Sequence, residues 1–545
     1  MRLLRVHVIT ADTCGGLLDG IDFWLRSPSG CFTAFDPLCL VGPNGAGKSQ
    51  FLQVLAEIFQ TVFHAAAPKE ERIEGNSTLQ FEDEYLIRSD EGTSDVAMRI
   101  ARIAEGKRKQ SVVIQKKVNG EWIECNLADS STLALLPSKV VGYTSGDNET
   151  LSLPFLLSRG GYADEVTSRA LSEESDPSGI PDTRLMLIDY GTHLEVLVAN
   201  LLLGEKDQRA ALLQGARLRD LHSFRCIVQL AHSAAPKAPA RRKATSTRKG
   251  IQLTDELEQH LDNLQRCATC YSYVEKTETY TFDFLVDDET RVAFGTFWKS
   301  TLGLYSALHK LSMLNDLAIP KPTRERFRKE AEGRRFASRL PEPQDEDKVF
   351  RFERVDFFSL SGGKIVDYVS LSDGEHQLAQ ILGTFCMVSF PNVLFLLDEP
   401  ESHFNPQWRV HFVSRLLDLP TPNGARRDGS AMAQRQDCLL STHAPFVPSD
   451  MRRDRVFIFH KDKATGRVAV RHPDIETYGT TFDSILEECF GVRPPISGEP
   501  RREIKDLMQS NDPVAITEGV ARLGHSVEKV FLADRLRQLA KKEDS

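Results

Sequence analysis

The stretch Gly42-Pro43-Asn44-Gly45-Ala46-Gly47-Lys48-Ser49 follows a short apolar run at 37–41 and precedes helical spacing at 49–63. It matches G-x-x-x-x-G-K-[ST] in the strand, loop and helix setting that this pattern requires. The glycines let successive backbone N–H groups turn toward phosphate oxygens, and the helix N-terminus adds partial positive charge. The sequence therefore predicts an ATP site in which Lys48 reaches the β- and γ-phosphates and Ser49 ligates Mg²⁺.

A second apolar run, at 393–397, ends in Asp398-Glu399-Pro400. Such a run is typical of a buried parallel strand with acids at its carboxyl end. In that position Asp398 is expected to hold Mg²⁺, directly or through water. Glu399 is expected to polarise the attacking water as general base.

Together the two motifs resemble those of the ABC class of ATPases, whose signature, usually L-S-G-G-Q, contacts the γ-phosphate held by the other subunit. Two segments compete for this role: LSGGK at 360–364 matches the letters better, and LSDGE at 371–375 matches them less well. A signature must open a helix so that its backbone donors face phosphate. A helical pattern follows 375, whereas 362–363 lies between two alternating runs and predicts a hairpin turn. We therefore expect Ser372, Gly374 and Glu375 to contact nucleotide, in a head-to-tail dimer.

The resemblance implies three further elements. ESHFNP at 401–406 resembles the D-loop, which contacts the other subunit. His443, in LSTHAP, resembles the switch histidine that hydrogen-bonds the γ-phosphate and completes the catalytic pair with Glu399. The Q-loop position, after the strand predicted at 139–143, carries no glutamine, and Asn148 is the expected substitute.

The order of these motifs predicts an α/β fold with a split nucleotide-binding head. Residues 1–150 form its β-rich N-terminal lobe and 351–460 its C-terminal lobe, which carries the signature, the acid pair and His443. A mostly helical insertion is expected at 151–350, with helical spacing at 185–213 and a hairpin around Asp287-Asp288. A helical tail is expected at 461–545.

Composition limits the function classes. The net charge of −9 argues against general affinity for nucleic acid. Ten scattered cysteines predict reduced thiols and a cytoplasmic location. No apolar run is long enough for a membrane span, and the N-terminus has no signal-peptide pattern.

Two weaker patterns leave alternatives open. Cys267 and Cys270 could share a zinc between two chains, but one pair supplies half of the usual four ligands, and ordinary thiols are favoured. A basic stretch could touch nucleic-acid phosphates or form a solvated helix face; it comprises Lys321, Arg324, Arg326, Arg328, Lys329, Arg334 and Arg335.

Within the soluble ABC ATPases of the SMC, RecF and OLD group, the chain resembles the restriction-system-associated AAA-type ATPase of Septu-like and retron-linked anti-phage defence systems. The resemblance rests on GPNGAGKS, YTSGDNETLSLPF, LSDGEHQLAQ, FLLDEPESHFNP and LSTHAPF. It implies an HNH-type nuclease as partner and, in retrons, a reverse transcriptase with its RNA–DNA product. The alternative is a RecF-like or SMC-like ATPase that acts on DNA itself in repair or maintenance.

The segment after His443 is too short for an added nuclease domain of usual size. No intrinsic nuclease is therefore expected. A helical pattern at 527–539 places Leu532, Leu536 and Leu539 on one face, beside an apolar patch of Val527, Val530 and Phe531. The patch could dock a separate nuclease or belong to the core.

Overall fold

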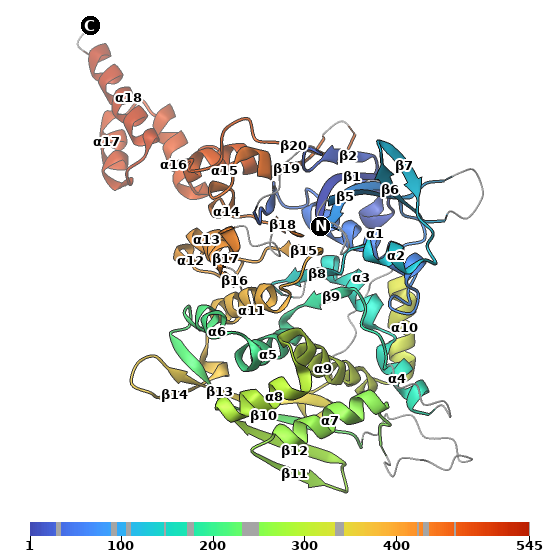
Figure 1. Cartoon of the computed structure of the whole chain (residues 1–545). Helices are drawn as coiled ribbons and strands as arrows, with labels where there is room; N and C mark the ends of the chain where they lie inside the picture. The colour runs from blue at the N-terminus through green and yellow to red at the C-terminus, as the bar shows by residue number, and fades with distance from the viewer. Residues whose placement is uncertain are drawn as a thin grey trace.

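The computed structural model describes residues 1–28, 34–88, 95–104, 111–146, 149–171, 179–231, 250–332, 343–421, 424–428, 435–462 and 465–543. Within these ranges the strands form three larger sheets, stacked with helices between them, and one two-stranded sheet of β16 (Pro420–Thr421) and β17 (Gly424–Ala425). Figure 1 shows the N-terminal sheet at one end of the body and the sheet built mainly from the middle of the chain at the other.

The central sheet joins strands from both ends of the sequence. Its order is β20 (Val468–Arg471), β19 (Val456–Lys461), β3 (Leu38–Val41), β18 (Gln436–Ser441), β15 (Val393–Asp398), β8 (Lys139–Thr144) and β9 (Leu185–Ile188). All pairs are parallel except β19 with β20. The split head that the sequence predicts is therefore one sheet, and its parallel strands end at one edge.

Both faces of this sheet are covered, which explains the continuous apolar runs in its strands. The loop at 42–49, called the P-loop below, leads into the helix α1 (Lys48–Ala66). In β3, Leu38 and Leu40 face the core around α1, whereas Cys39 and Val41 face the core around α11 (Asp373–Met387). β15 and β18 divide their side chains between the two cores in the same way.

The N-terminal sheet is antiparallel and covers α1 from the other side. Its order is β2 (Ile21–Trp24), β1 (Arg2–Thr10), β4 (Gln80–Arg88), β5 (Asp95–Arg102), β6 (Val113–Val118) and β7 (Glu121–Glu124). The hairpin at Asn119-Gly120 joins β6 to β7, as the dipeptide predicts. The short helix α2 (Ser130–Ala134) then leads to β8. Because α1 lies between two sheets, its apolar side chains are buried all round.

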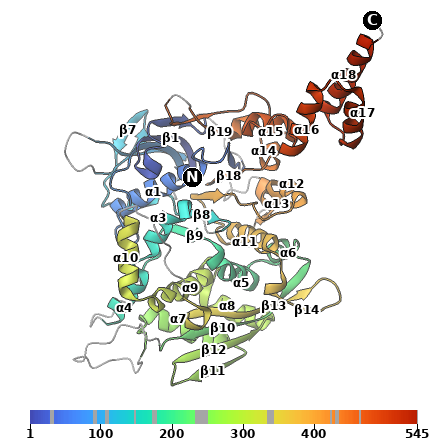
Figure 2. The ribbon, with the colours of Figure 1, turned by 180° about the vertical axis from the view of Figure 1, so that it is seen from behind.

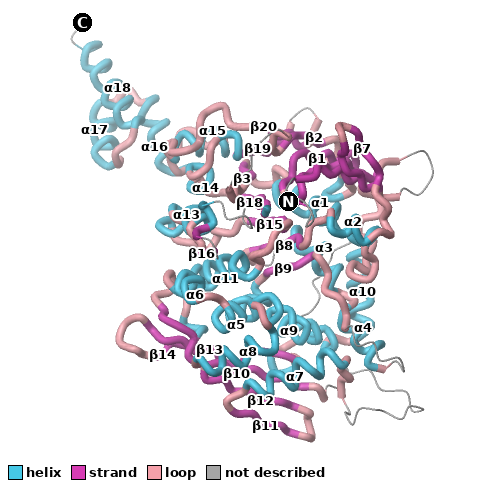
Figure 3. Tube along the Cα trace, in the orientation of Figure 1, coloured by secondary structure: helices cyan, strands magenta, loops and turns pink. Residues whose placement is uncertain are grey.

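The segment between the lobes is less helical than the sequence predicts. β9 joins the central sheet beside β8. A third, antiparallel sheet follows, in the order β11 (Cys270–Val274), β12 (Thr279–Leu285), β10 (Leu218–Gln229), β13 (Phe350–Ser359) and β14 (Ile365–Asp367). Figure 3 shows this sheet as magenta strands at the end of the body remote from the N-terminal sheet. It is built across the predicted boundary at 350, since β13 and β14 pair with strands of the insertion.

The helices of this region are α3 (Glu149–Arg159), α4 (Tyr162–Ala170), α5 (His193–Leu203), α6 (Lys206–Leu213), α7 (Asp255–Cys267), α8 (Asp288–Trp298), α9 (Thr301–Met313) and α10 (Lys321–Glu332). Figure 1 shows α5, α8 and α9 between the central and the third sheet. Two local predictions are wrong. Helical spacing at 185–213 begins with the strand β9, because a short apolar run has no decisive period. Asp287 caps α8 by accepting from Thr290 N, and the hairpin of this region instead joins β11 to β12.

The lobe predicted at 351–460 carries α11, α12 (Pro406–Val410), α13 (Phe412–Leu417) and α14 (Phe446–Ser449). After the strands β19 and β20 the tail is helical: α15 (Phe482–Phe490), α16 (Gly498–Gln509), α17 (Pro513–Arg522) and α18 (Val527–Glu543). The views of Figures 1 and 2 agree that α16, α17 and α18 project from the body. No helix in the described part of the chain is long and apolar enough to cross a membrane.

The three projecting helices share a small core of their own. Leu532 is fully buried there against Ile504, Leu507 and Ile516, and Leu536 and Leu539 pack at its edge. Val527, Val530 and Phe531 lie outside it, with 65%, 66% and 56% of their surfaces exposed. The leucine face is thus core, whereas the neighbouring patch is open to solvent.

Candidate nucleotide-binding site

The loop from Gly42 to Gly47 leaves β3 at the carboxyl edge of the central sheet and enters α1. Gly42 has φ +137, and a Cβ there would lie 2.2 Å from the carbonyl oxygen of Phe459 on β19, so only glycine fits. Gly45 and Gly47 also have positive φ. Gly47 is the residue before α1, at whose first two positions Lys48 and Ser49 lie.

The acid pair lies beside this loop because β15, β18 and β3 are neighbours in register. Asp398 on β15 is opposite Ser441 on β18, which is opposite Leu40 on β3. Ser49 Oγ donates a hydrogen bond of 3.0 Å to Asp398 Oδ1. Ser441 Oγ donates a short hydrogen bond to the same oxygen. The two sequence motifs thus meet through a direct contact between residues 349 positions apart in the chain.

The hydroxyl and carboxylate of Ser49 and Asp398 fit a Mg²⁺ site. Mg²⁺ takes oxygen ligands, and proteins usually supply one or two while water and phosphate supply the rest. The described residues form no cluster of three or more His, Cys, Asp and Glu side chains that could hold a metal. Burial raises the pKa of Asp398, against the lowering effect of its two serine hydrogen bonds. A cation beside this carboxylate would offset that cost.

Lys48, His443 and Glu399 converge at the same edge. Lys48 Nζ lies 3.0 Å from His443 Nε2, and that nitrogen lies 3.3 Å from Glu399 Oε1. Burial, together with the charge of Lys48, lowers the pKa of His443 to about 4, so the ring is neutral at pH 7 and its Nε2 accepts from the ammonium. Burial also lowers the pKa of Lys48 to about 8, although the charges of Glu399 and Asp398 oppose the shift. A lysine with so low a pKa gains from contact with an anion.

Glu399 has φ +48, a backbone conformation that is costly for a side chain other than glycine. Its backbone N–H donates to Ser441 Oγ at 3.1 Å, which holds the turn. The Glu399 carboxylate is 41% exposed, whereas Asp398 is buried. Asp398 is thus enclosed by the protein, whereas the Glu399 carboxylate is accessible to solvent.

Sequence reasoning missed Ser441, although it lies in the LSTH motif. Its hydroxyl links Asp398 to the backbone of Glu399 and so fixes both acids. The feature of the sequence that could have identified Ser441 is a small hydroxyl residue at the last position of an apolar strand. That strand, β18, pairs with β15, which carries the acids. The Thr442 hydroxyl holds a third acid, since it donates to the Glu401 carboxylate and accepts from Ala444 N.

Ser372 precedes α11 and forms a capping box with Glu375. Glu375 Oε2 accepts from the backbone N–H and the hydroxyl of Ser372, both at 2.8 Å. Gly374 is buried, and a Cβ there would lie 2.9 Å from the carbonyl oxygen of His403. The competing LSGGK segment forms the turn between β13 and β14, with positive φ at Gly362 and Gly363. The helix and the hairpin are therefore where the sequence places them, and contact with nucleotide stays a prediction.

The segment that resembles a D-loop is bonded to both neighbours of the site. Gln377 on α11 accepts from His403 N at 3.0 Å and donates to Ser402 Oγ at 3.3 Å. His403 Nε2 lies 3.1 Å from the carbonyl oxygen of Ser145, just after β8. The start of α11, the turn after β15 and the end of β8 are thus linked to one another by hydrogen bonds. Asn148 lies outside the described residues.

The basic stretch on α10 is largely internally paired. Arg324 is nearly buried, with Nη1 2.5 Å from Asp164 Oδ1. Lys321 pairs with Glu325, and Arg326 with Glu330, one helical turn on. This pattern favours the solvated-helix interpretation. The side chain of Arg328 and residues Arg334 and Arg335 lie outside the described part.

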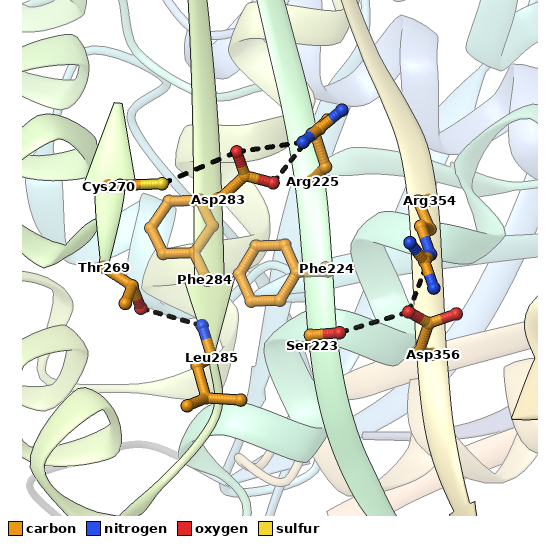
Figure 4. Close-up of a pocket in the computed structure, with 10 residues that line it drawn as sticks. All are labelled: Ser223, Phe224, Arg225, Thr269, Cys270, Asp283, Phe284, Leu285, Arg354 and Asp356. Carbon is orange, nitrogen blue, oxygen red and sulfur yellow. Dashed lines mark hydrogen bonds and ion pairs between the residues drawn. The ribbon is translucent and has the colours of Figure 1, made fainter. Parts of the chain in front are cut away.

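Cys267 and Cys270 are both free thiols, the first buried at the end of α7 and the second exposed on β11. Cys270 lines a hollow on the third sheet, drawn in Figure 4. Its charged side chains pair with one another: Arg225 with Asp283 at 2.7 Å, and Arg354 with Asp356 at 2.8 Å. This hollow offers no free charge for a ligand, in contrast to the edge of the central sheet.

Residues 293–450 match the family described as "AAA domain, putative AbiEii toxin, Type IV TA system". The match spans well under half of the chain. It contains the residues from Ser372 to His443 described above and leaves the loop at 42–49 outside. No curated protein matches the sequence.

Among solved structures, the chain is similar to the SMC head domain from Thermotoga maritima, at 10% identity and a TM-score of 0.32, with 87% of this chain and 100% of that chain covered. It is also similar to the Smc head of Pyrococcus furiosus bound to the C-terminal domain of ScpA, at 11% identity and 0.27, covering 86% and 96%. A third is the recombination mediator RecF, at 12% identity and 0.30, covering 83% and 96%.

Proposed function

We propose that the chain binds ATP with Mg²⁺ and hydrolyses it at the site formed by Lys48, Ser49, Asp398, Glu399 and His443. The observation that carries the proposal is their convergence at the carboxyl edge of one parallel sheet, directly beside a glycine-rich loop that opens a helix. The family match to an AAA domain over 293–450 supports the same activity.

In this proposal each side chain has one task. Lys48 and the backbone N–H groups of the loop neutralise the β- and γ-phosphates, and His443 hydrogen-bonds the γ-phosphate. Glu399, whose carboxylate is exposed, takes a proton from the attacking water. Ser49 and Asp398 would hold Mg²⁺, which supplies charge stabilisation on the phosphates when bound. Ser441 is a positioning residue, since it holds Asp398 and the Glu399 backbone.

The test compares Lys48→Ala with Glu399→Gln in separate binding and turnover assays. Lys48→Ala should lose ATP affinity. Glu399→Gln should bind ATP and fail to turn it over. Equal turnover by the wild type and Glu399→Gln would refute the role of this carboxylate.

The working unit is proposed to be a head-to-tail dimer in which Ser372, Gly374 and Glu375 contact the nucleotide of the partner. Two features support it. Ser372 is exposed at the start of α11, where backbone donors point outward. Its side-chain hydrogen bonds among the described residues stay within its own helix turn.

The biological role we propose is that of the ATPase subunit of an anti-phage defence assembly, which holds and regulates a separate HNH-type nuclease. The matched family's description, which names a toxin and a toxin–antitoxin system, favours a defence setting. The exposed patch of Val527, Val530 and Phe531 on α18 is a candidate docking surface for the nuclease. Purification of the chain with the products of its neighbouring genes tests the assignment. A co-purifying nuclease supports it, whereas association with recombination proteins alone favours the alternative, a RecF-like or SMC-like ATPase of DNA maintenance.

A further inference from the structure

A cavity of about 80 Å³ lies remote from the acid pair, between the edge of the central sheet and the insertion. Its lining comes from β8, β9, α3, α4 and α9, together with Arg72 and the segment 181–183. Figure 1 shows where these helices and strands lie in the fold. A water molecule needs about 10–15 Å³ on this measure. The cavity therefore has room for a tetrahedral oxyanion or for a small cluster of waters.

Several residues that line this cavity carry a buried polar atom without a hydrogen-bond partner in the described structure. These atoms are the hydroxyls of Tyr162 and Tyr305, the Nδ1 atom of His309 and one terminal nitrogen of Arg72. Tyr305 is 3% exposed, and its ring stacks on that of His309 with centroids 5.4 Å apart. A buried hydroxyl without a partner costs about 1–3 kcal/mol. Two such hydroxyls, an imidazole nitrogen and a guanidinium nitrogen in the lining of one cavity indicate that a polar ligand or water supplies their missing hydrogen bonds.

The charge around the cavity selects an anion. The described lining contains three basic side chains, Arg72, Lys139 and Arg159, and one acid, Asp182. Arg72 is paired through Nε with Glu165 at 2.5 Å, so Lys139 and Arg159 carry the positive charge that is left for a ligand. Asp182 is already held by Lys310 at 3.2 Å and by the Ser306 hydroxyl. Arg159 makes no hydrogen bond or ion pair with any described residue, although it lies near enough to Tyr305 and His309 to influence both electrostatically.

The pKa shifts of His309 and Lys139 also favour an anion. Burial lowers the pKa of His309 to about 3, with the charge of Arg159 as the next cause, so the imidazole is neutral and can either donate or accept at Nδ1. Burial also lowers the pKa of Lys139, whose Nζ donates to the Thr183 carbonyl oxygen at 2.6 Å. Positive charge in this cavity is thus poorly solvated, and a bound anion would relieve it.

The cavity is connected to the P-loop helix by direct hydrogen bonds. Phe155, Ser158 and Arg159 of α3 line it, and the carbonyl oxygen of Pro154 on the same helix accepts from Gln60 of α1 at 3.0 Å. Ser158 and Thr183, both in the lining, donate to the buried carboxylate of Glu71, which lies a few residues beyond α1. A ligand that moves α3 would therefore act on the helix that carries Lys48 and Ser49.

We propose that this cavity binds a small phosphate group, held by Arg159, Lys139 and the hydroxyls of Tyr162 and Tyr305, and that the occupied cavity fixes α3 against α1. The group is either free phosphate or the phosphate of a small metabolite, since the same donors suit both. Binding here does not depend on the proposed ATPase activity, and it is tested apart from it.

The test titrates inorganic phosphate, and separately adenosine monophosphate, into the full chain by calorimetry in the Lys48→Ala background, which weakens binding at the P-loop. The Lys48→Ala chain should take up phosphate, and adding Arg159→Gln should weaken that uptake about tenfold to a hundredfold, since one charge-assisted contact is lost. Tyr305→Phe should weaken it as well, whereas Tyr190→Phe, at a tyrosine that is 64% exposed, should not.

Melting curves without phosphate provide a second readout. Tyr305→Phe should melt no lower than the Lys48→Ala chain alone, because the substitution deletes a hydroxyl that has no protein partner. Identical titrations of the Lys48→Ala chain with and without Arg159→Gln, for both probes, would overturn the proposal and leave a hydrated cavity. If the wild type shows no ATP turnover, the proposed ATPase function is refuted but the phosphate site is not, because these titrations do not involve hydrolysis.

Discussion

Glu399→Gln is the perturbation that separates nucleotide binding from hydrolysis most cleanly. The Glu399 backbone, at φ +48, is held by its own N–H bond to Ser441 Oγ, and glutamine retains that bond. Among the described residues, the close polar neighbour of the carboxylate is His443, at 3.3 Å, and that ring is neutral. The substitution therefore removes a proton acceptor and little structural support.

The expected magnitude follows from the role. A general base contributes about 10²–10⁴-fold, or about 3–5 kcal/mol of transition-state free energy, so kcat should fall by that range. ATP affinity should be retained at pH 7. Because the charge of Glu399 supports the charged form of Lys48, whose pKa is about 8, the variant should lose affinity at a lower pH than the wild type as pH rises.

The assay measures ATP affinity by equilibrium binding and turnover by phosphate release, for the wild type, Glu399→Gln and the matched control Glu487→Gln. Glu487 is a half-exposed residue of α15 that pairs with Arg493. The control should match the wild type in both assays. A Glu399→Gln chain that hydrolyses ATP within about threefold of the wild type would show that Glu399 is not the general base, because a general base contributes about 10²–10⁴-fold.

Three further predictions concern assembly, pH and the tail. Neither Lys48→Ala nor Ser372→Arg chains should hydrolyse ATP alone, but their mixture should recover at most one working site per dimer; activity of a monomeric preparation equal to that of the dimer would contradict the composite site. Burial raises the pKa of Glu401 from 4.5 to about 7, so the folded state holds a proton that the unfolded state loses, and stability should fall as pH rises between those values. Glu401→Gln should remove that fall in stability, which is at most about 3 kcal/mol. The measurement is the melting temperature as a function of pH for the wild type and the variant. Parallel profiles would show that Glu401 does not titrate between these pH values. The purified chain should not cleave DNA with Mg²⁺ or Mn²⁺, with or without ATP; metal-dependent cleavage that disappears on mutating residues outside the ATP site would reveal a nuclease centre in this chain. Finally, Phe531→Asp should abolish capture of the nuclease subunit without lowering ATP turnover.

The central sheet could be predicted from the sequence because its information is local. The loop at 42–49 and the apolar run before Asp398 each carry their own strand and helix context. Parallel strands that are buried on both faces then leave few ways to place them, and the motifs meet at one edge.

The insertion could not be predicted as well, because its strands depend on distant partners. β9 is a short apolar run that a helix pattern fits equally, and only its pairing with β8 makes it a strand. β10 pairs with β13, about 130 residues later in the chain, which no local period reveals. At Asp287 the same acid that suits a turn also suits a helix cap, and the bond from Thr290 N decides for the cap.

The site shows the same division. Lys48, Ser49, Asp398, Glu399 and His443 are brought together as the motifs predict. The support from Ser441 and the cavity around Tyr305 and His309 are not visible in the sequence, because each depends on elements that become neighbours only in the folded chain.

The most direct test of the central claim is a structure of the Glu399→Gln chain with ATP and Mg²⁺. The account predicts the phosphates on the loop from Gly42 to Gly47, with Lys48 and His443 at the γ-phosphate and Mg²⁺ between Ser49 and Asp398. It also predicts that Ser372 of a second copy faces the same nucleotide. ATP bound away from Lys48, or Mg²⁺ held without Asp398, would contradict it.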